Sequence, residues 1–202
     1  MSRARKNVLQ NPWVLIALML LLAACGPVLA FTPERAVVQD LMTSNAGQII
    51  PNSIQVLQVQ PWLDGRLVLS AYQTQDANRK MDCVSLTQVV QRRTGWVPVS
   101  GGAGCQSGST NTQPIDINGG GVSGGDRQPL KYYYGLVYDP NIATVEVSWD
   151  DGEVQSILVE NGSYLLVRNG NPEALQVRAL NAAQEVIFSF DMAEPAPGKQ
   201  EP

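Results

Sequence analysis

The chain has 202 residues, 44% of them hydrophobic, and it carries 14 basic and 18 acidic residues but no histidine. The lack of histidine excludes the Ser-His-Asp triad, the Cys-His pair and every zinc or iron site that needs an imidazole ligand. Because three basic residues lie in the first six positions, the chain from position 25 onward has a net charge near −7. A field of that sign attracts neither nucleic acid nor anionic lipid, so we expect no nucleic-acid partner and no attraction of the body as a whole to anionic lipid.

The first thirty residues have the layout of an export signal. Arg3, Arg5 and Lys6 precede an uncharged run from Trp13 to Ala24. In such signals the positive charges stay on the cytoplasmic side while the apolar run enters the bilayer. The body of the protein is therefore predicted to lie outside the cytoplasmic membrane.

The apolar run ends in Leu22-Ala23-Ala24-Cys25, which resembles the lipobox of bacterial lipoproteins. The resemblance implies that a signal peptide of residues 1–24 is removed and that the thiol of Cys25 is acylated. Residues 25–31 would then form a lipidated tether to the cell membrane or the outer membrane, because buried acyl chains hold a protein to a bilayer.

Two other interpretations of this segment stay open. Cleavage after Val28-Leu29-Ala30, an A-x-A-like site, would release a secreted protein. An uncleaved helix from Pro12 to Phe31 would be long enough to cross the bilayer once. Gly26-Pro27 disfavours the helix, because proline removes a backbone donor and disturbs the preceding turn.

With Cys25 assigned to lipid, Cys83 and Cys105 remain as an even pair. Exported proteins meet an oxidising environment, so we predict a disulfide between them, with Cys105 just past the end of a strand. The bridge would close a loop of about twenty residues and stabilise the fold by roughly 3 kcal/mol. The alternative, a free reactive thiol, needs a neighbouring base or cation.

Residues 32–100 are predicted to form a small α+β domain. Thr32 as the cap, Pro33 in the first turn and apolar residues at helical spacing predict one helix of about ten residues. Strand patterns follow, with a hairpin turn at Asp64-Gly65 and a slip in the alternation at Leu57. A helix before an antiparallel meander is similar in architecture to cystatin and NTF2-like domains.

The rest of the chain is predicted to be a linker and a β-sandwich. Residues 101–129 are rich in Gly, Ser, Asn and Thr, which predicts a linker or a long exposed loop, and 193–202 read as a disordered tail. In 130–192, about six short strands separated by Asp-Gly and Asn-Gly turns predict an Ig-like antiparallel sandwich. The predicted core positions are Val145, Val147, Trp149, Leu175, Val177, Ala179, Val186, Phe188 and Phe190. The fold class is thus mainly β.

Acidic residues near two predicted turns are candidates for a calcium site. Asp150, Asp151 and Glu153 follow one strand, and Asp139 and Asn141 precede it. Their oxygen atoms are suitable calcium ligands. The same sequences are ordinary turn formers, and we favour the turns.

Aromatic residues of the sandwich are candidates for a sugar-stacking platform. The residues are Tyr132, Tyr133, Tyr134, Tyr138, Trp149 and Tyr164. Trp149 shares the face of Val145 and Val147, which favours a place in the core. The pair Arg92-Arg93 is interpreted as a solvated turn. No catalytic, cofactor-binding or metal site is predicted.

These features together predict a membrane-anchored envelope lipoprotein without enzymatic activity, which binds or scaffolds an envelope protein or the cell wall at the cell surface. One alternative is a small-ligand-binding or carboxylate-based enzymatic α+β domain with a pocket. Another is an envelope assembly factor that offers a strand edge to a partner.

Overall fold

The computed structural model describes residues 30–44, 48–50, 52–76, 79–107, 113–122 and 129–192. The predicted signal peptide, Cys25 and the predicted tail lie outside these residues. Within the described ranges, no helix has the length and apolar character needed to cross a membrane.

The predicted helix is present as α2 (Pro33–Ser44). The backbone N–H of Arg35 donates to Thr32 Oγ1 at 3.3 Å, which satisfies one of the free donors of the first turn. Glu34 lies in that turn, where the helix dipole favours a negative charge. Val37 and Leu41 are 0% and 7% exposed, and they attach the helix to the sheet beneath it.

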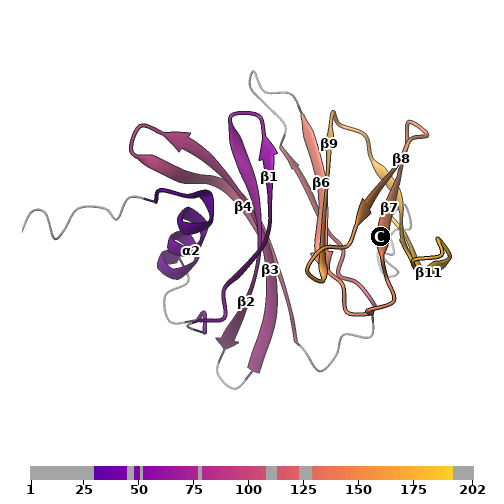
Figure 1. Ribbon diagram of the computed structural model, residues 1–202, viewed down its shortest axis with the longest axis horizontal. Helices are drawn as coiled ribbons and strands as arrows, with labels where there is room; N and C mark the ends of the chain where they lie inside the picture. The colour runs from indigo at the N-terminus through magenta and orange to yellow at the C-terminus, as the bar shows by residue number, and fades with distance from the viewer. Residues whose placement is uncertain are drawn as a thin grey trace, which may run out of the picture.

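The helix covers one face of an antiparallel sheet with the strand order β1-β2-β3-β4 (Figure 1). The strands are β1 (Gln55–Trp62), β2 (Gly65–Asp76), β3 (Arg79–Arg92) and β4 (Gly95–Ser107). This confirms the predicted meander. The register of β1 shifts between Val56 and Gln58, where the sequence predicts a slip. Leu57 packs on the side of the sheet away from the helix, and the bulge returns Val59 to the helix side.

The β1–β2 hairpin forms where predicted but with different turn residues. Trp62 pairs with Gly65, so the loop residues are Leu63 and Asp64, and Leu63 has the positive φ of 44°. Gly65 is required for another reason, since a Cβ at this position would collide with the carbonyl of Val89 on β3.

The second half of the chain is a β-sandwich of two antiparallel sheets. One sheet has the order β5-β6-β9 and the other β11-β10-β7-β8. The strands are β5 (Asn118–Val122), β6 (Leu130–Leu136), β7 (Thr144–Trp149), β8 (Val154–Leu158), β9 (Ser163–Asn169), β10 (Ala174–Leu180) and β11 (Val186–Asp191). Val145, Val147 and Trp149 are at most 1% exposed, and the core between the two sheets contains them as predicted.

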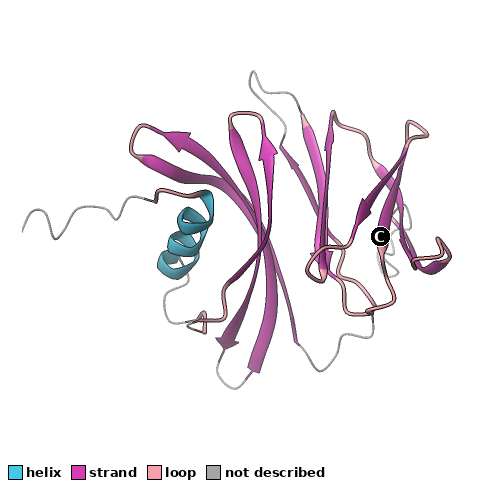
Figure 2. Cartoon of the chain, in the orientation of Figure 1, coloured by secondary structure: helices cyan, strands magenta, loops and turns pink. Residues whose placement is uncertain are grey.

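The sheets stack into layers, in the order α2, β1–β4, β5-β6-β9 and the outer sheet (Figure 1). Strands make up the three sheet layers and the helix lies at one end of the stack (Figure 2). The middle sheet is buried on both faces: Tyr164 and Leu166 of β9 face the sandwich core, whereas Leu165 faces the first sheet.

The contact between the first and middle sheets is a hydrophobic core of its own. Its buried residues are Trp62, Leu67, Leu69, Val84, Leu86, Leu130, Tyr134 and Leu165. Hydrogen bonds complete it, because Gln60 Nε2 donates to the carbonyl of Leu165 at 3.0 Å and Gln58 Nε2 to that of Ser163 at 3.2 Å. The two halves of the chain therefore form one packed body.

The prediction of a linker over 101–129 is wrong for the parts that the structure describes. Strand β4 continues to Ser107, and β5 lies within the segment and supplies a seventh strand to the sandwich. Glycine hid these strands, because it contributes backbone hydrogen bonds without apolar periodicity. A small residue is required in β5, since a Cβ on Gly121 would collide with the backbone carbonyl of Leu130.

The core prediction also fails at three positions. The register shifts between Ala174 and Gln176, so Ala174 is buried while Leu175 is 44% exposed. Phe190 is 40% exposed on β11, an edge strand of its sheet. Val186 is 51% exposed because the register shifts between Ala179 and Leu180, so that Val186 pairs with Leu180 and lies on the opposite face from Phe188. Phe188 is partly buried and contacts the core as predicted.

Candidate functional site

A hollow with a volume of about 600 Å³ lies between α2 and β4. Its lining is mostly apolar and includes Ala30, Ala36, Met42, Trp96, Val97 and Pro98. A second hollow of about 420 Å³ shares Asp40 and Pro98 with it and continues along β4. We call the two hollows together the α2–β4 groove.

The local fold explains why the groove stays open. The backbone N–H of Trp96 donates to the carbonyl of Ala30 at 2.9 Å, which holds the start of the described chain against β4. Ala36 is too small to fill the space beside Met42, which is 43% exposed. Among the described strands β4 is one of the two edges of its sheet, and Val97 on it remains 39% exposed.

The continuation of the groove is polar. Ser85, Thr87 and Ser100 line it, and the buried Oγ of Ser85 has no hydrogen-bond partner among the described residues. Asp40 and Tyr72 are the ionisable groups in the described lining of both hollows. Burial raises the pKa of Tyr72, which keeps its phenol a hydrogen-bond donor. The groove is thus suited to a ligand with an apolar body and a neutral polar end.

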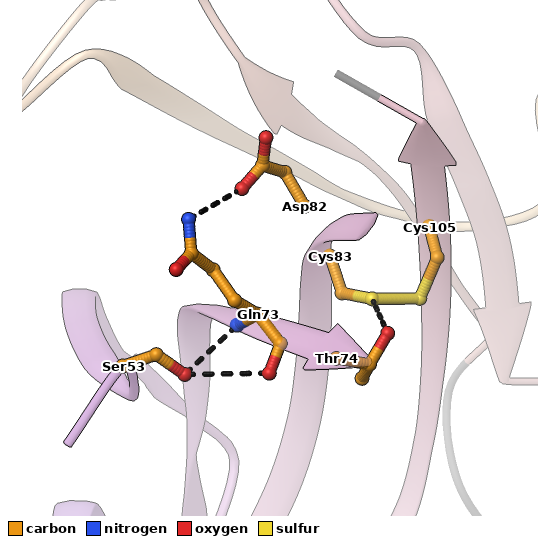
Figure 3. Close-up of a disulfide and its surroundings, with 6 residues drawn as sticks. All are labelled: Ser53, Gln73, Thr74, Asp82, Cys83 and Cys105. Carbon is orange, nitrogen blue, oxygen red and sulfur yellow. Dashed lines mark hydrogen bonds between the residues drawn. A yellow bond between two sulfur atoms is a disulfide. The ribbon is translucent and has the colours of Figure 1, made fainter. Parts of the chain in front are cut away.

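The predicted disulfide between Cys83 and Cys105 is confirmed (Figure 3). Cys105 lies inside β4, directly opposite Cys83 on β3, rather than past the end of the strand. Thr74 Oγ1 lies 3.6 Å from the sulfur of Cys83, which is 1% exposed. The bridge therefore lies within the sheet and covalently links the edge strand β4 to its neighbour β3.

The surroundings of the bridge are ordered by hydrogen bonds from the segment before β1 (Figure 3). The backbone N–H of Gln73 donates to Ser53 Oγ at 2.9 Å, and Gln73 Nε2 donates to Asp82 at 2.8 Å. Together with Tyr138 from the sandwich, these residues line a hollow of about 350 Å³ beside the bridge.

Asp116 is a buried, hydrogen-bonded carboxylate that the sequence analysis did not single out. It is 3% exposed, accepts hydrogen bonds from Gln106 Nε2 and from Tyr138 Oη, and its carbonyl accepts one from Tyr164 Oη at 2.8 Å. These bonds tie β4 and the sandwich to the segment that joins them. The apolar residues Ile115 and Ile117 on either side of Asp116 are the sequence feature that could have indicated a buried segment here.

The structure does not bring the calcium candidates together. Asp150 and Asp151 lie at one end of β7 and Asp139 before its other end, so the whole strand separates them. Asp139 accepts from the N–H of Asn141 at 2.9 Å, and Asp151 pairs with Arg168 at 2.5 Å. In the described part of the chain, no group of three acidic or cysteine side chains is placed to hold a metal.

The aromatic candidates point into two separate cores. Tyr133 packs edge-on against Trp149, with ring centroids 5.7 Å apart, in the sandwich core. Tyr134 lies in the core between the sheets, and burial there raises its pKa from 10.0 to about 12. Burial also raises the pKa of Tyr164. Tyr138 is the exposed member of this set, so the described aromatic side chains form no stacking platform.

Arg92 and Arg93 are exposed at the β3–β4 turn, in agreement with the interpretation as a solvated turn.

Comparison with known proteins gives no family assignment, since no protein-family model, no curated protein and no solved structure matches the chain.

Proposed function

We propose that the protein is a bacterial envelope lipoprotein, anchored by lipid on Cys25, whose body binds or scaffolds partners at the cell surface. The observation that carries this proposal is the lipobox-like Leu22-Ala23-Ala24-Cys25 behind a basic and then apolar segment. The disulfide supports it, because such bridges persist in oxidising compartments outside the cytoplasm.

The outer sheet supports a binding role. Strand β11 is an edge strand among the described residues, and Val186, Ile187 and Phe190 are 39–51% exposed on it. An apolar edge of this kind offers unpaired backbone groups and side-chain contacts to a strand of a partner. An envelope protein or a peptide of the cell wall is the expected partner.

A second candidate function is small-ligand binding in the α2–β4 groove. The observation that favours it is the apolar lining of one hollow together with the buried hydroxyl of Ser85 in the adjoining hollow, which has no hydrogen-bond partner among the described residues. A pocket with few polar groups in an apolar wall is typical of small-molecule sites.

Cells that express the protein and are fed a fatty-acid analogue should incorporate the label into the wild type and not into Cys25→Ser. The reason is that acylation of this class uses the thiol at the new N-terminus. The matched control is Cys105→Ser, which also loses one thiol but should keep the label. Equal labelling of wild type and Cys25→Ser would refute the anchor.

Crosslinking in the same cells, followed by mass spectrometry of what copurifies, tests the binding role. A single stoichiometric protein partner is expected, and Phe190→Asp should reduce its recovery because a charge is placed on the apolar edge. Val154→Asp, at a residue 50% exposed on β8, is the control. Recovery of an apolar small molecule alone would favour the second candidate.

A further inference from the structure

The position of the groove relative to the predicted anchor limits where the body can lie. Ala30, which itself lines the groove, comes five positions after Cys25 in the sequence. A chain of that length spans at most roughly 18 Å when fully extended. If Cys25 carries lipid, as proposed above, the groove therefore lies within this distance of the bilayer surface.

Exposed apolar side chains gather at the same place. Phe31 is 72% exposed and follows Ala30, whose carbonyl accepts the hydrogen bond from Trp96. Val97 comes directly after Trp96, and Val97 and Met42 both line the groove. Leu63, 58% exposed, lies in the β1–β2 turn, which is at the same end of the meander as the β3–β4 turn. Single exposed apolar residues are ordinary, but several around one groove mark a contact surface.

The charges at this end differ from those of the body as a whole. Arg92 and Arg93 are exposed at the β3–β4 turn, and Arg66 lies over the ring of Trp96 with its guanidinium carbon 5.7 Å from the centroid. Arg35 is exposed in the first turn of α2. The acidic residues of this end are Glu34, Asp40 and Asp64. Basic residues thus outnumber acidic ones here, whereas the chain from Cys25 onward is net negative.

We propose that the α2–β4 groove and the adjoining turns rest on a phospholipid bilayer, with acyl chains of the bilayer in contact with Trp96, Val97 and Met42. Apolar side chains at the level of the interface gain free energy by leaving water. Arginines around them can reach anionic headgroups while their stems stay in the apolar region. The opposite end of the stack, with β11, then faces away from the membrane and remains free for a partner. This inference rests on the proposed anchor.

The natural tryptophans allow a direct test. Cleavage before Cys25 removes Trp13, and Trp62 and Trp149 are 5% and 1% exposed, which leaves Trp96 as the partly exposed indole. The acylated protein is reconstituted into vesicles of phosphatidylcholine and phosphatidylglycerol with brominated acyl chains, which quench indole emission on contact. We expect loss of most of the Trp96 emission and little quenching in Trp96→Phe.

Substitutions on the exposed surface separate docking from mere proximity. Val97→Asp should restore most of the Trp96 emission, because a buried carboxylate opposes insertion. Val154→Asp on β8 should leave the quenching unchanged. Vesicles without phosphatidylglycerol should quench less, since the arginines lose their headgroup partners.

Each remaining outcome has a distinct meaning. If Trp96 is not quenched in protein whose mass shows lipid on Cys25, the docking is overturned and the anchor stays intact. A protein, or the lipid of Cys25 itself, would then be the occupant of the groove. A mass without lipid overturns the anchor. Strong quenching that persists in Trp96→Phe shows that Trp13 is retained in an uncleaved segment, which overturns both.

Discussion

Substitution of Leu165 by alanine is expected to lower the free energy of unfolding by about 2–5 kcal/mol. Leu165 is 0% exposed on β9 and packs in the core between the first and middle sheets. The loss combines the transfer free energy of the missing methyl groups with the cavity they leave. The hydrogen bond from Gln60 to the carbonyl of residue 165 should remain, because it uses the main chain.

The form of the unfolding curve is as informative as its midpoint. If the layers unfold as one cooperative unit, the urea midpoints should shift by the same amount whether unfolding is followed by Trp62, in the core between the first and middle sheets, or by Trp149, in the sandwich core. Single-tryptophan reporters made by Trp→Phe replacement of the others separate the two signals. Val154→Ala, at a half-exposed residue, should change stability by less than about 0.5 kcal/mol.

A different result would separate the two halves. If Leu165→Ala shifted the Trp62 signal alone and left that of Trp149 unchanged, the core between the sheets would be an interface between independently stable domains. The side-chain bonds from Gln58 and Gln60 would then be docking contacts rather than part of a single core.

Periodicity in the sequence predicts those elements whose side chains alternate between a core and solvent. Thr32 and the stripe through Val37 and Leu41 predict α2, and the break at Leu57 predicts a slip in the alternation, which agrees with the register shift of β1. The same method fails where side chains are absent. Gly101 to Gly104 pair along β3 through backbone atoms alone, so the segment carries no pattern that an alternation rule detects.

Edge effects account for the other errors. Val186 and Phe190 share the alternation of core residues in the sequence. A register shift turns Val186 to the other face of β11, and Phe190 lies on a strand with no described neighbour on its outer side, so both stay exposed. Alternation shows which residues share a face and not whether that face is covered. Strand β5 was not predicted for a different reason, because it is rich in glycine like the end of β4 and has no apolar alternation.

The groove itself could not be predicted, because it depends on residues distant in the sequence. Met42 of α2 and Val97 of β4 meet only when the helix lies across the sheet. The calcium candidates failed in the opposite way. Asp139 and Asp151 are close in the sequence, but an extended strand between them holds them apart.

Removal of the Cys83–Cys105 bridge is expected to lower the free energy of unfolding by about 3 kcal/mol. The cysteines are 22 residues apart, and the bridge limits the unfolded chain by closing that loop. The denaturant dependence should also steepen in Cys83→Ala/Cys105→Ala, because an unfolded chain without the bridge exposes more surface.

Comparison with single variants distinguishes the covalent effect from packing. Cys83 is 1% exposed in the core under α2, so Cys83→Ala alone removes both the bridge and a buried sulfur, whereas Cys105→Ala removes the bridge from a more exposed site. If loop closure dominates, both single variants and the chemically reduced wild type should lose similar stability. An unfolding midpoint that chemical reduction of the wild type leaves unchanged would contradict this expectation. The backbone pairing of β3 and β4 would then stabilise this edge of the sheet without a contribution from the cross-link.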